Sequence, residues 1–407
     1  MKAPMTETPS SRRAAARARQ AARRARRQRQ ALVSVTVLAA LAVAAAAVSA
    51  LALTPQARPS GVVPARGAVP APPRSAAASA SAAIAQSARP ATLTVSAVGD
   101  MIFDRRVKSL IQTSGGAAPL AKVDQLLRRP DITVGNLESP LSSRGARDAD
   151  KDVTFRGDPR AIEGLSNAGF DFLSLANNHV LDYGPDALAD TISTLDDHGI
   201  GHAGAGTDKD AAFTPAVAER DGATIAFLSF SHILPPGFVA TSSRPGLAQG
   251  RSNMDEVTEA IREAKAHNDY VIVSFHWGVE YVDDANADQV RDAHRAVDAG
   301  ADMVLSHHPH VIQAVEYYKG QLIAYSLGDF VFDHYSRKTG EAFILDAELG
   351  PDGVANVSVT PVYLDTNGRP EVVTGSAAQT ILSRLRQISA KRSTEVRVTG
   401  DTAEVLP

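Results

Sequence analysis

The sequence predicts an α/β protein in which strands alternate with helices, and helices cover both faces of the sheets. After about residue 91, short apolar runs rich in β-branched residues alternate with segments of helical periodicity. These runs are apolar throughout, which is typical of strands buried on both faces. Polar side chains able to bind metal follow one run after another, and sites in α/β sheets form at the carboxyl ends of strands.

The elements expected in the first part of this region are strands and helices in alternation. Gly169 and Gly199 stand where two of the helices end, and Pro185 stands in a first helical turn. The strands are expected over 93–98, 131–134, 170–175, 225–230, 270–275, 303–305 and 322–326, and the helices over 159–168, 185–198, 254–267 and 286–299.

The last part of the chain has a different pattern, with the alternation of a β-hairpin followed by a helix. We expect residues 342–407 to complete the same domain as residues 91–341. The expected elements are strands over 343–349 and 355–362 joined at 351–353, a helix over 377–392 and a strand over 395–398.

The first ninety residues have a separate composition. Residues 1–30 are rich in arginine, residues 31–53 contain no charged side chain, and residues 54–90 are rich in Pro, Ala and Ser. An apolar run of about 23 residues can cross a bilayer, and the basic flank predicts that the N-terminus stays in the cytoplasm. We therefore expect a basic cytoplasmic tail, a single-pass transmembrane signal anchor and a disordered linker, with the main domain outside the cell membrane. Cleavage near residues 50–52, which would release a secreted protein, is the alternative.

Composition limits the chemistry. The chain has no cysteine, so disulfides, thiolate metal sites and cysteine nucleophiles are excluded, and any metal must be held by His, Asp, Glu or Asn. The net charge of −3 combines a basic N-terminal tail with an acidic remainder. An acidic main domain argues against binding to nucleic acid, and we expect no nucleic-acid partner.

Candidate metal ligands follow the predicted strands. Imidazole suits Zn, Fe and Mn, and carboxylate suits Mn and Mg. The six candidate ligands, which mix nitrogen and oxygen donors, are too many for one tetrahedral zinc. They fit two divalent ions, with Mn, Fe or Zn as candidates. His179 is the expected catalytic acid, because an imidazole beside a metal ligand can donate a proton to a leaving oxygen. The expected ligands are Asp100, Glu138, Asn178, His276, His308 and His310.

Each of these residues also has a purely structural interpretation. Asp100 follows a glycine and could form a turn, and Asn178 could bond to loop backbone. His276 could be a core histidine, and the histidines of 307–310 could lie in a solvated loop. The combination favours a metal site, since one strand end after another delivers such a group.

The order and spacing of these residues resemble the CapA family of capsule (poly-γ-glutamate) biosynthesis proteins. The resemblance extends over about residues 92–365. It rests on Ala-Val-Gly-Asp-Met at 97–101, Gly-Asn-Leu-Glu at 135–138, Ala-Asn-Asn-His at 176–179, Ser-Phe-His-Trp-Gly at 274–278, Ser-His-His-Pro-His-Val at 306–311 and Ser-Leu-Gly-Asp-Phe at 326–330.

The resemblance implies a layered α/β/β/α sandwich related to calcineurin-like metallophosphoesterases, with a dinuclear metal centre. It implies the ligand roles given above and makes His179 the catalytic acid. The chain departs from the phosphoesterase pattern at Ile102, where a histidine is usual, and at Glu138, where aspartate is more frequent. Residues expected to contact substrate or support the ligands are Asn136, Asn177, Trp277, Glu280, His307 and Asp329.

The expected function is that of a cell-envelope protein of capsule or poly-γ-glutamate biosynthesis. It would be a metal-dependent hydrolase acting on a phosphoester or an anionic polymer, and other polymer-synthesis proteins are candidate partners. The alternative is a non-catalytic component that binds or exports the polymer. A wall-binding structural module is a third interpretation, and it predicts no bound metal.

Overall fold

The computed structural model describes residues 91–407. The predicted tail (1–30), transmembrane anchor (31–53) and linker (54–90) lie outside the described residues. Within 91–407, no helix has the length and apolar character needed to cross a membrane.

The larger sheet has ten strands and is built around β1, which has a parallel neighbour along one side and, along the other, an antiparallel neighbour followed by a short parallel one. The parallel half consists of β1 (Leu93–Met101), β2 (Ile132–Leu137), β3 (Phe172–Ser174) and β4 (Gly201–Ala203), with β13 (Asp329–Val331) also parallel to β1. The antiparallel half consists of β14 (Glu341–Gly350), β15 (Gly353–Leu364), β18 (Thr402–Leu406), β17 (Glu395–Thr399) and β16 (Pro370–Val372). The C-terminal strands therefore extend the sheet that β1 begins.

The second sheet has six strands, four of them parallel. The parallel strands are β7 (Ala223–Ser231), β9 (Tyr270–His276), β10 (Met303–His307) and β12 (Gln321–Ala324). Antiparallel strands form its two edges, β6 (Ala216–Arg220) and β11 (Val315–Tyr318). Two short strands, β5 (Ala205–Gly206) and β8 (Gly246–Leu247), pair separately.

The two sheets pack face to face, with β1 against β10, β3 against β7 and β12 against β15. Side chains of β1 alternate between the two faces of the sheet. Val95 and Ala97 belong to the core between the sheets, whereas Val98 and Met101 pack into a second core on the outer face. Burial of both faces explains why the strands are apolar throughout.

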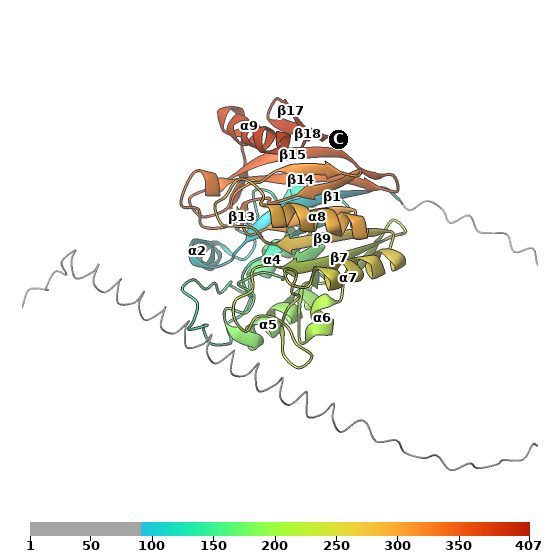
Figure 1. Cartoon of the computed structure of the whole chain (residues 1–407). Coiled ribbons are helices and arrows are strands. Elements are labelled where there is room, and N and C mark those ends of the chain that lie inside the picture. Colours follow the sequence, from blue (N-terminus) through green and yellow to red (C-terminus); the bar gives the residue numbers. More distant parts are fainter. Residues whose placement is uncertain (1–90) are drawn as a thin grey trace, which may run out of the picture. The chain divides into compact units, whose positions relative to one another are not determined.

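Helices cover the outer faces of both sheets (Figure 1). α7 (Met254–His267) and α8 (Ala287–Ala299) pack on the second sheet. The outer core of the larger sheet is closed by α2 (Arg105–Ser114), α3 (Asp124–Leu127), α4 (Ala161–Asn167) and α5 (Gly184–Asp197). α9 (Gly375–Ala390) packs against β11, β15 and β17, and α6 (Lys209–Phe213) and a 3-10 turn (Lys338–Gly340) complete the set. The predicted α/β sandwich is confirmed.

Candidate metal centre

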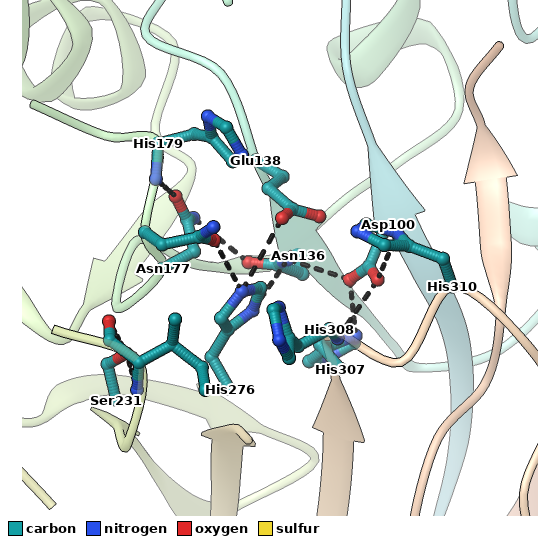
Figure 2. Close-up of polar contacts among 12 residues, drawn as sticks. Asp100, Asn136, Glu138, Asn177, His179, Ser231, His276, His307, His308 and His310 are labelled. Atoms are coloured by element: carbon teal, nitrogen blue, oxygen red, sulfur yellow. Dashed lines mark hydrogen bonds and ion pairs between the residues drawn. The ribbon is translucent and has the colours of Figure 1, made fainter. Parts of the chain in front are cut away.

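The predicted ligands come together where parallel strands of both sheets end. Asp100 lies next to the last residue of β1, and Glu138 directly follows β2. His276 is the last residue of β9, and His308 and His310 follow β10. Figure 2 shows these side chains pointing toward one another although they come from two different sheets.

Asp100 is fully buried and held from several directions. Its Oδ1 accepts a hydrogen bond from Asn136 Nδ2 at 2.8 Å, and its Oδ2 accepts one from the His308 backbone N–H at 3.1 Å. His307 Nδ1 lies 3.2 Å from Oδ1. Burial alone would raise the pKa of Asp100, but the imidazoles of His307 and His310 outweigh it and hold the pKa below its ordinary value. The Asp100 carboxylate is therefore ionised at neutral pH.

A close backbone crossing places Asp329 beside Asp100. The Asp100 N–H donates to Gly328 O at 2.9 Å, and Asp100 and Asp329 face each other in the β1–β13 pair. A Cβ atom on Gly99 would lie only 1.9 Å from Gly328 O, so only glycine fits there. Gly99 thus allows the close approach of the two strands that brings the two carboxylates together.

His310 and Asp329 form a buried pair, with Nδ1 2.8 Å from Oδ1. Burial would lower the pKa of His310, but the carboxylates of Asp329, Glu138 and Asp100 raise it well above its usual value. Burial raises the pKa of Asp329 to about 7, against the opposing effect of His310. The cluster therefore holds more carboxylate than its own histidines balance, which favours a bound cation.

Glu138 is the residue that most clearly favours a bound cation. Its side chain is fully buried, and neither carboxylate oxygen has a hydrogen-bond partner among residues 91–407. His276 Nε2 lies 3.4 Å from Oε1. Burial, followed by repulsion from Asp100, raises the pKa of Glu138 well above its usual value. A buried acid without a partner is costly, and a divalent cation would satisfy both oxygens.

Three overlapping groups of buried side chains have ligand atoms within 4.8 Å of one another. Each combines carboxylate oxygen with imidazole nitrogen, a donor set that suits Mn, Fe and Zn. The groups are Asp100 with Glu138 and His276, Glu138 with His308 and His310, and Asp100 with His310 and Asp329. Glu138 and Asp100 belong to two groups each, so these two carboxylates are shared between the candidate metal-binding groups. The residues present fit a divalent metal site.

The asparagines around the cluster have distinct positions. Asn178 Oδ1 lies 2.8 Å from His276 Nε2, so this predicted ligand borders the cluster. Asn177 Nδ2 donates to Leu137 O at 2.8 Å and to Asn136 Oδ1 at 3.1 Å, and its Oδ1 accepts from the His179 N–H. Asn136 and Asn177 therefore tie the loop after β3 to Asp100.

His179 belongs to a buried polar group that includes two residues missed from the sequence. Its Nδ1 lies 2.6 Å from Asp182 Oδ2, and the Lys151 ammonium contacts Asp182 Oδ1 and the backbone oxygen of Asn178. Burial lowers the pKa of His179 to about 4, although Asp182 acts in the opposite direction. Asp182 could have been suspected from its position three residues after His179, but Lys151 comes from a loop without a sequence signal.

Two predicted supporting residues lie elsewhere. The Trp277 indole is fully buried, stacks on Phe275 with ring centroids 4.4 Å apart, and donates from Nε1 to Tyr325 O at 3.2 Å. Trp277 is therefore a core residue; of the two roles expected of it, contact with substrate or support of the ligands, its burial is compatible only with support. Glu280 is exposed, and its charge contributes to raising the pKa of Asp329. Glu280 therefore lies at the solvent edge of the site.

Fold and site together define an α/β sandwich protein with a buried carboxylate–imidazole cluster suited to divalent metal. Residues 94–334 match the model of the family described as "Bacterial capsule synthesis protein PGA_cap". The chain belongs to this family, which confirms the resemblance to CapA proteins.

Relatives with curated names agree with this assignment. "PGA biosynthesis protein CapA" of Bacillus subtilis is 34% identical over 272 residues, covering 66% of this chain and 71% of the relative. "Capsule biosynthesis protein CapA" of Bacillus anthracis is 32% identical over 289 residues, covering 70% of each chain. A "Probable polyglutamine synthesis accessory protein" of Mycobacterium tuberculosis is 34% identical over 229 residues, covering 54% of this chain and 60% of its own length.

Solved structures share less with this chain. A hypothetical protein from Thermus thermophilus has a TM-score of 0.43 at 18% identity, covering 66% of this chain and 98% of its own. A sulfate thiohydrolase, SoxB, has a TM-score of 0.37 at 15% identity, covering 70% of this chain and 49% of its own. Neither likeness carries an argument about function.

Proposed function

We propose that this protein is a metal-dependent hydrolase of the cell envelope that acts on a phosphoester or an anionic polymer in capsule or poly-γ-glutamate biosynthesis. The names of the two Bacillus relatives support the biosynthetic role. The observation that carries the hydrolase proposal is Glu138, whose carboxylate is buried among imidazoles without a hydrogen-bond partner in the described part of the chain. Such a carboxylate is expected where a cation belongs.

The proposed centre holds two divalent ions, with Mn, Fe or Zn as candidates. Bound there, they would lower the pKa of water and polarise a substrate oxygen. The residues proposed to hold them are Asp100, Glu138, Asn178, His276, His308 and His310. Asp329 would keep His310 in place through the contact at Nδ1, and Asn136 would do the same for Asp100.

His179 is the proposed proton-transfer residue. Its lowered pKa makes neutral imidazole the prevailing form at pH 7, so the ring is suited to accept a proton before it returns one to a leaving group. Asp182 binds Nδ1 and thereby fixes the orientation of the ring. Lys151 neutralises the buried Asp182 carboxylate and holds the Asn178 backbone. The arrangement combines a proton carrier with an orienting carboxylate.

One observation favours the alternative of a polymer-binding protein without turnover. Ile102 stands where phosphoesterases usually have a histidine, and its side chain is fully buried with Phe155, Phe332 and Leu364. A metal ligand at this position would require that apolar cluster to move. The centre is therefore one imidazole short of the usual phosphoesterase set.

The deciding experiment combines metal analysis with turnover. The purified chain should contain divalent metal by elemental analysis and should hydrolyse either a phosphoester or a γ-glutamyl polymer. Loss of turnover on chelation and its return with Mn or Zn would support the hydrolase. Bound metal without turnover on either substrate class would leave the polymer-binding alternative, and a protein that binds no metal would exclude both.

The proposed location is the cell membrane, with residues 91–407 on the outer side and other capsule or polymer-synthesis proteins as partners. The basic flank and apolar run of residues 1–53 support this orientation. Protease added to intact spheroplasts should digest the main domain. Digestion only after lysis would refute the orientation, and release of the domain into the medium would indicate signal cleavage.

A further inference from the structure

Arg105 begins α2 with a backbone conformation that arginine rarely adopts. Its φ angle is +54°, in the left-handed region that favours glycine. The preceding Asp104 is fixed by a hydrogen bond from the Arg156 N–H to Oδ2 at 2.8 Å. Strained backbone of this kind persists only where the surroundings impose it, and it is concentrated at functional sites.

Aromatic rings connect Arg105 to the metal centre. Its guanidinium carbon lies 4.6 Å from the centroid of the Phe155 ring. That ring lies 4.2 Å from the His179 ring and 5.7 Å from Phe332, which in turn lies 4.9 Å from the His310 ring. The guanidinium is thus one aromatic ring away from the proton-transfer residue His179 and two rings away from the proposed metal ligand His310.

The Arg105 guanidinium has hydrogen-bond donors that its contacts within residues 91–407 do not use. Nη1 donates to the Tyr335 hydroxyl at 2.6 Å and lies 3.9 Å from Asp333 Oδ2. The hydrogen bond and the ion pair of Arg105 within residues 91–407 both involve Nη1, so the Nε–Nη2 edge has two donors without a partner among these residues. The side chain is 33% exposed. Lys151, the other cation beside His179, is by contrast bound to Asp182.

Exposed apolar side chains lie beside Arg105 and beside the proposed metal ligand His310. Tyr335 is 69% exposed, and Tyr281 is 55% exposed with its ring 6.1 Å from that of His310. Val279 and Val282, on either side of Tyr281, are also exposed. Large apolar side chains in contact with water are expected where a ligand covers them.

We propose that Arg105 binds an α-carboxylate of a γ-linked glutamyl polymer, so that it determines specificity for a carboxylate-bearing chain beside the metal centre. The inference rests on the proposed function and adds a specificity-determining residue for the substrate of that site. A γ-glutamyl unit carries one carboxylate and two methylene groups. One guanidinium edge matches one carboxylate through two parallel hydrogen bonds, and Tyr281 and Tyr335 match the methylene groups.

The test measures binding of three probes to the full-length chain and its variants. The probes are a γ-linked glutamyl hexamer, the same hexamer with its α-carboxylates methylated, and a glycerol-phosphate oligomer. Arg105→Met should weaken binding of the free hexamer about 10- to 100-fold, the effect of losing a charge-assisted pair, and should leave the methylated hexamer unchanged. Arg105→Lys should restore part of the affinity, because it keeps the charge but not the paired donors.

Two variants separate recognition from folding. Arg105→Gly should bind as poorly as Arg105→Met but melt at the same or a higher temperature, because glycine adopts a φ of +54° without strain. Arg106→Met is the matched control. Arg106 is the exposed neighbour whose Nη1 lies 3.3 Å from Thr366 O, and its loss should leave binding unchanged.

The possible outcomes are distinct. Unchanged affinity of Arg105→Met, or an equal loss for the methylated hexamer, would overturn the inference. Stronger, Arg105-dependent binding of the glycerol-phosphate oligomer would overturn the choice of carboxylate. If the wild-type protein shows no turnover but binds the free hexamer through Arg105, the hydrolase proposal fails and the inference stands.

Discussion

At the scale of single residues, backbone strain accompanies the ligands of the proposed centre. His308 and His310 have φ angles of +97° and +56°, in the region that non-glycine residues avoid. Such residues cost on the order of 1–3 kcal/mol each and persist where the surrounding structure over-determines them. The His308 N–H bound to Asp100, and the His310 ring paired with Asp329, are the contacts that hold this loop.

Replacing both histidines tests the ligand assignment. His308→Ala with His310→Ala should remove most of the bound metal and leave the fold, because the core strands lie elsewhere and alanine removes only loop side chains. Elemental analysis and circular dichroism would measure the two effects. The control is His198→Ala with His267→Ala, two exposed histidines on helix ends. Full metal content in the first double variant would remove His308 and His310 from the ligand set.

Replacing His179 tests the chemistry. General acid–base catalysis contributes about 10²–10⁴-fold, so His179→Ala should lower kcat by that factor while metal content stays constant. A residue that only braced the loop would instead lower the melting temperature and leave kcat unchanged. Turnover, melting temperature and metal content measured on one variant distinguish the two roles.

The sequence pointed to the residues of the buried carboxylate–imidazole cluster more clearly than to the residues that contact them. Glu138 and His276 are recognisable because they follow buried apolar runs. Lys151 reaches Asp182 from the loop of residues 142–157, and this loop has no periodic pattern from which the contact could be predicted. Trp277 follows the proposed ligand His276 directly in sequence, but it lies just beyond the end of β9 and its side chain is buried against Phe275 in the core.

At the scale of elements, interior strands and amphipathic helices were predictable and edges were not. The helix expected over 254–267 coincides with α7 (Met254–His267). The strand expected over 170–175 is shorter, because β3 pairs only over Phe172–Ser174. Edge strands such as β6 and β11 were missed, since only one side of an edge strand is paired and its pattern is less apolar.

The C-terminal helix α9 is tied to the loop that carries Tyr281. Arg384 donates to Glu341 Oε2 at 2.8 Å and to Asp283 Oδ1 at 2.6 Å, and Lys391 pairs with Asp284 at 2.6 Å. Glu341 is nearly fully buried. This part of the chain lies beyond residues 94–334, which match the family model. The C-terminal element therefore holds a loop at the edge of the site.

Removing Arg384 should be destabilising. Arg384→Met leaves the buried Glu341 carboxylate without its main partner. Breaking a buried ion pair in this way lowers the free energy of unfolding by about 3–5 kcal/mol. Arg386→Met, on the exposed side of the same helix, should change stability by less than about 0.5 kcal/mol. Denaturant unfolding of both variants measures the difference. Equal stability of the two would show that the Arg384 contacts carry no net stabilisation.

At the scale of the whole molecule, the proposed metal centre joins the two sheets. Asp100 and Glu138 come from the larger sheet, whereas His276 and His308 come from the second one. A ligand that binds only the folded state stabilises it, by about 2.7 kcal/mol at a free concentration one hundred times Kd. Metal should therefore strengthen the packing of one sheet on the other in addition to serving chemistry.

Glu138 should show opposite effects with and without metal. In metal-free protein its carboxylate is buried beside Asp100 and Asp329 without a hydrogen-bond partner in the described chain. Glu138→Gln removes this repulsion, so the metal-free variant should exceed metal-free wild type in stability by at least about 1 kcal/mol. With metal the order should reverse, because the neutral amide is a poorer ligand and the variant gains less from binding.

Thermal unfolding in EDTA and in excess Mn measures both differences on the same two proteins. Asn356→Ala, on the surface far along β15, serves as the control and should show the same response to Mn as wild type. A Glu138→Gln protein that is less stable than wild type in EDTA would show that the carboxylate is satisfied without metal. If Glu138→Gln is more stable than wild type in EDTA and less stable in Mn, the Glu138 carboxylate stabilises the metal-bound protein and destabilises the metal-free protein.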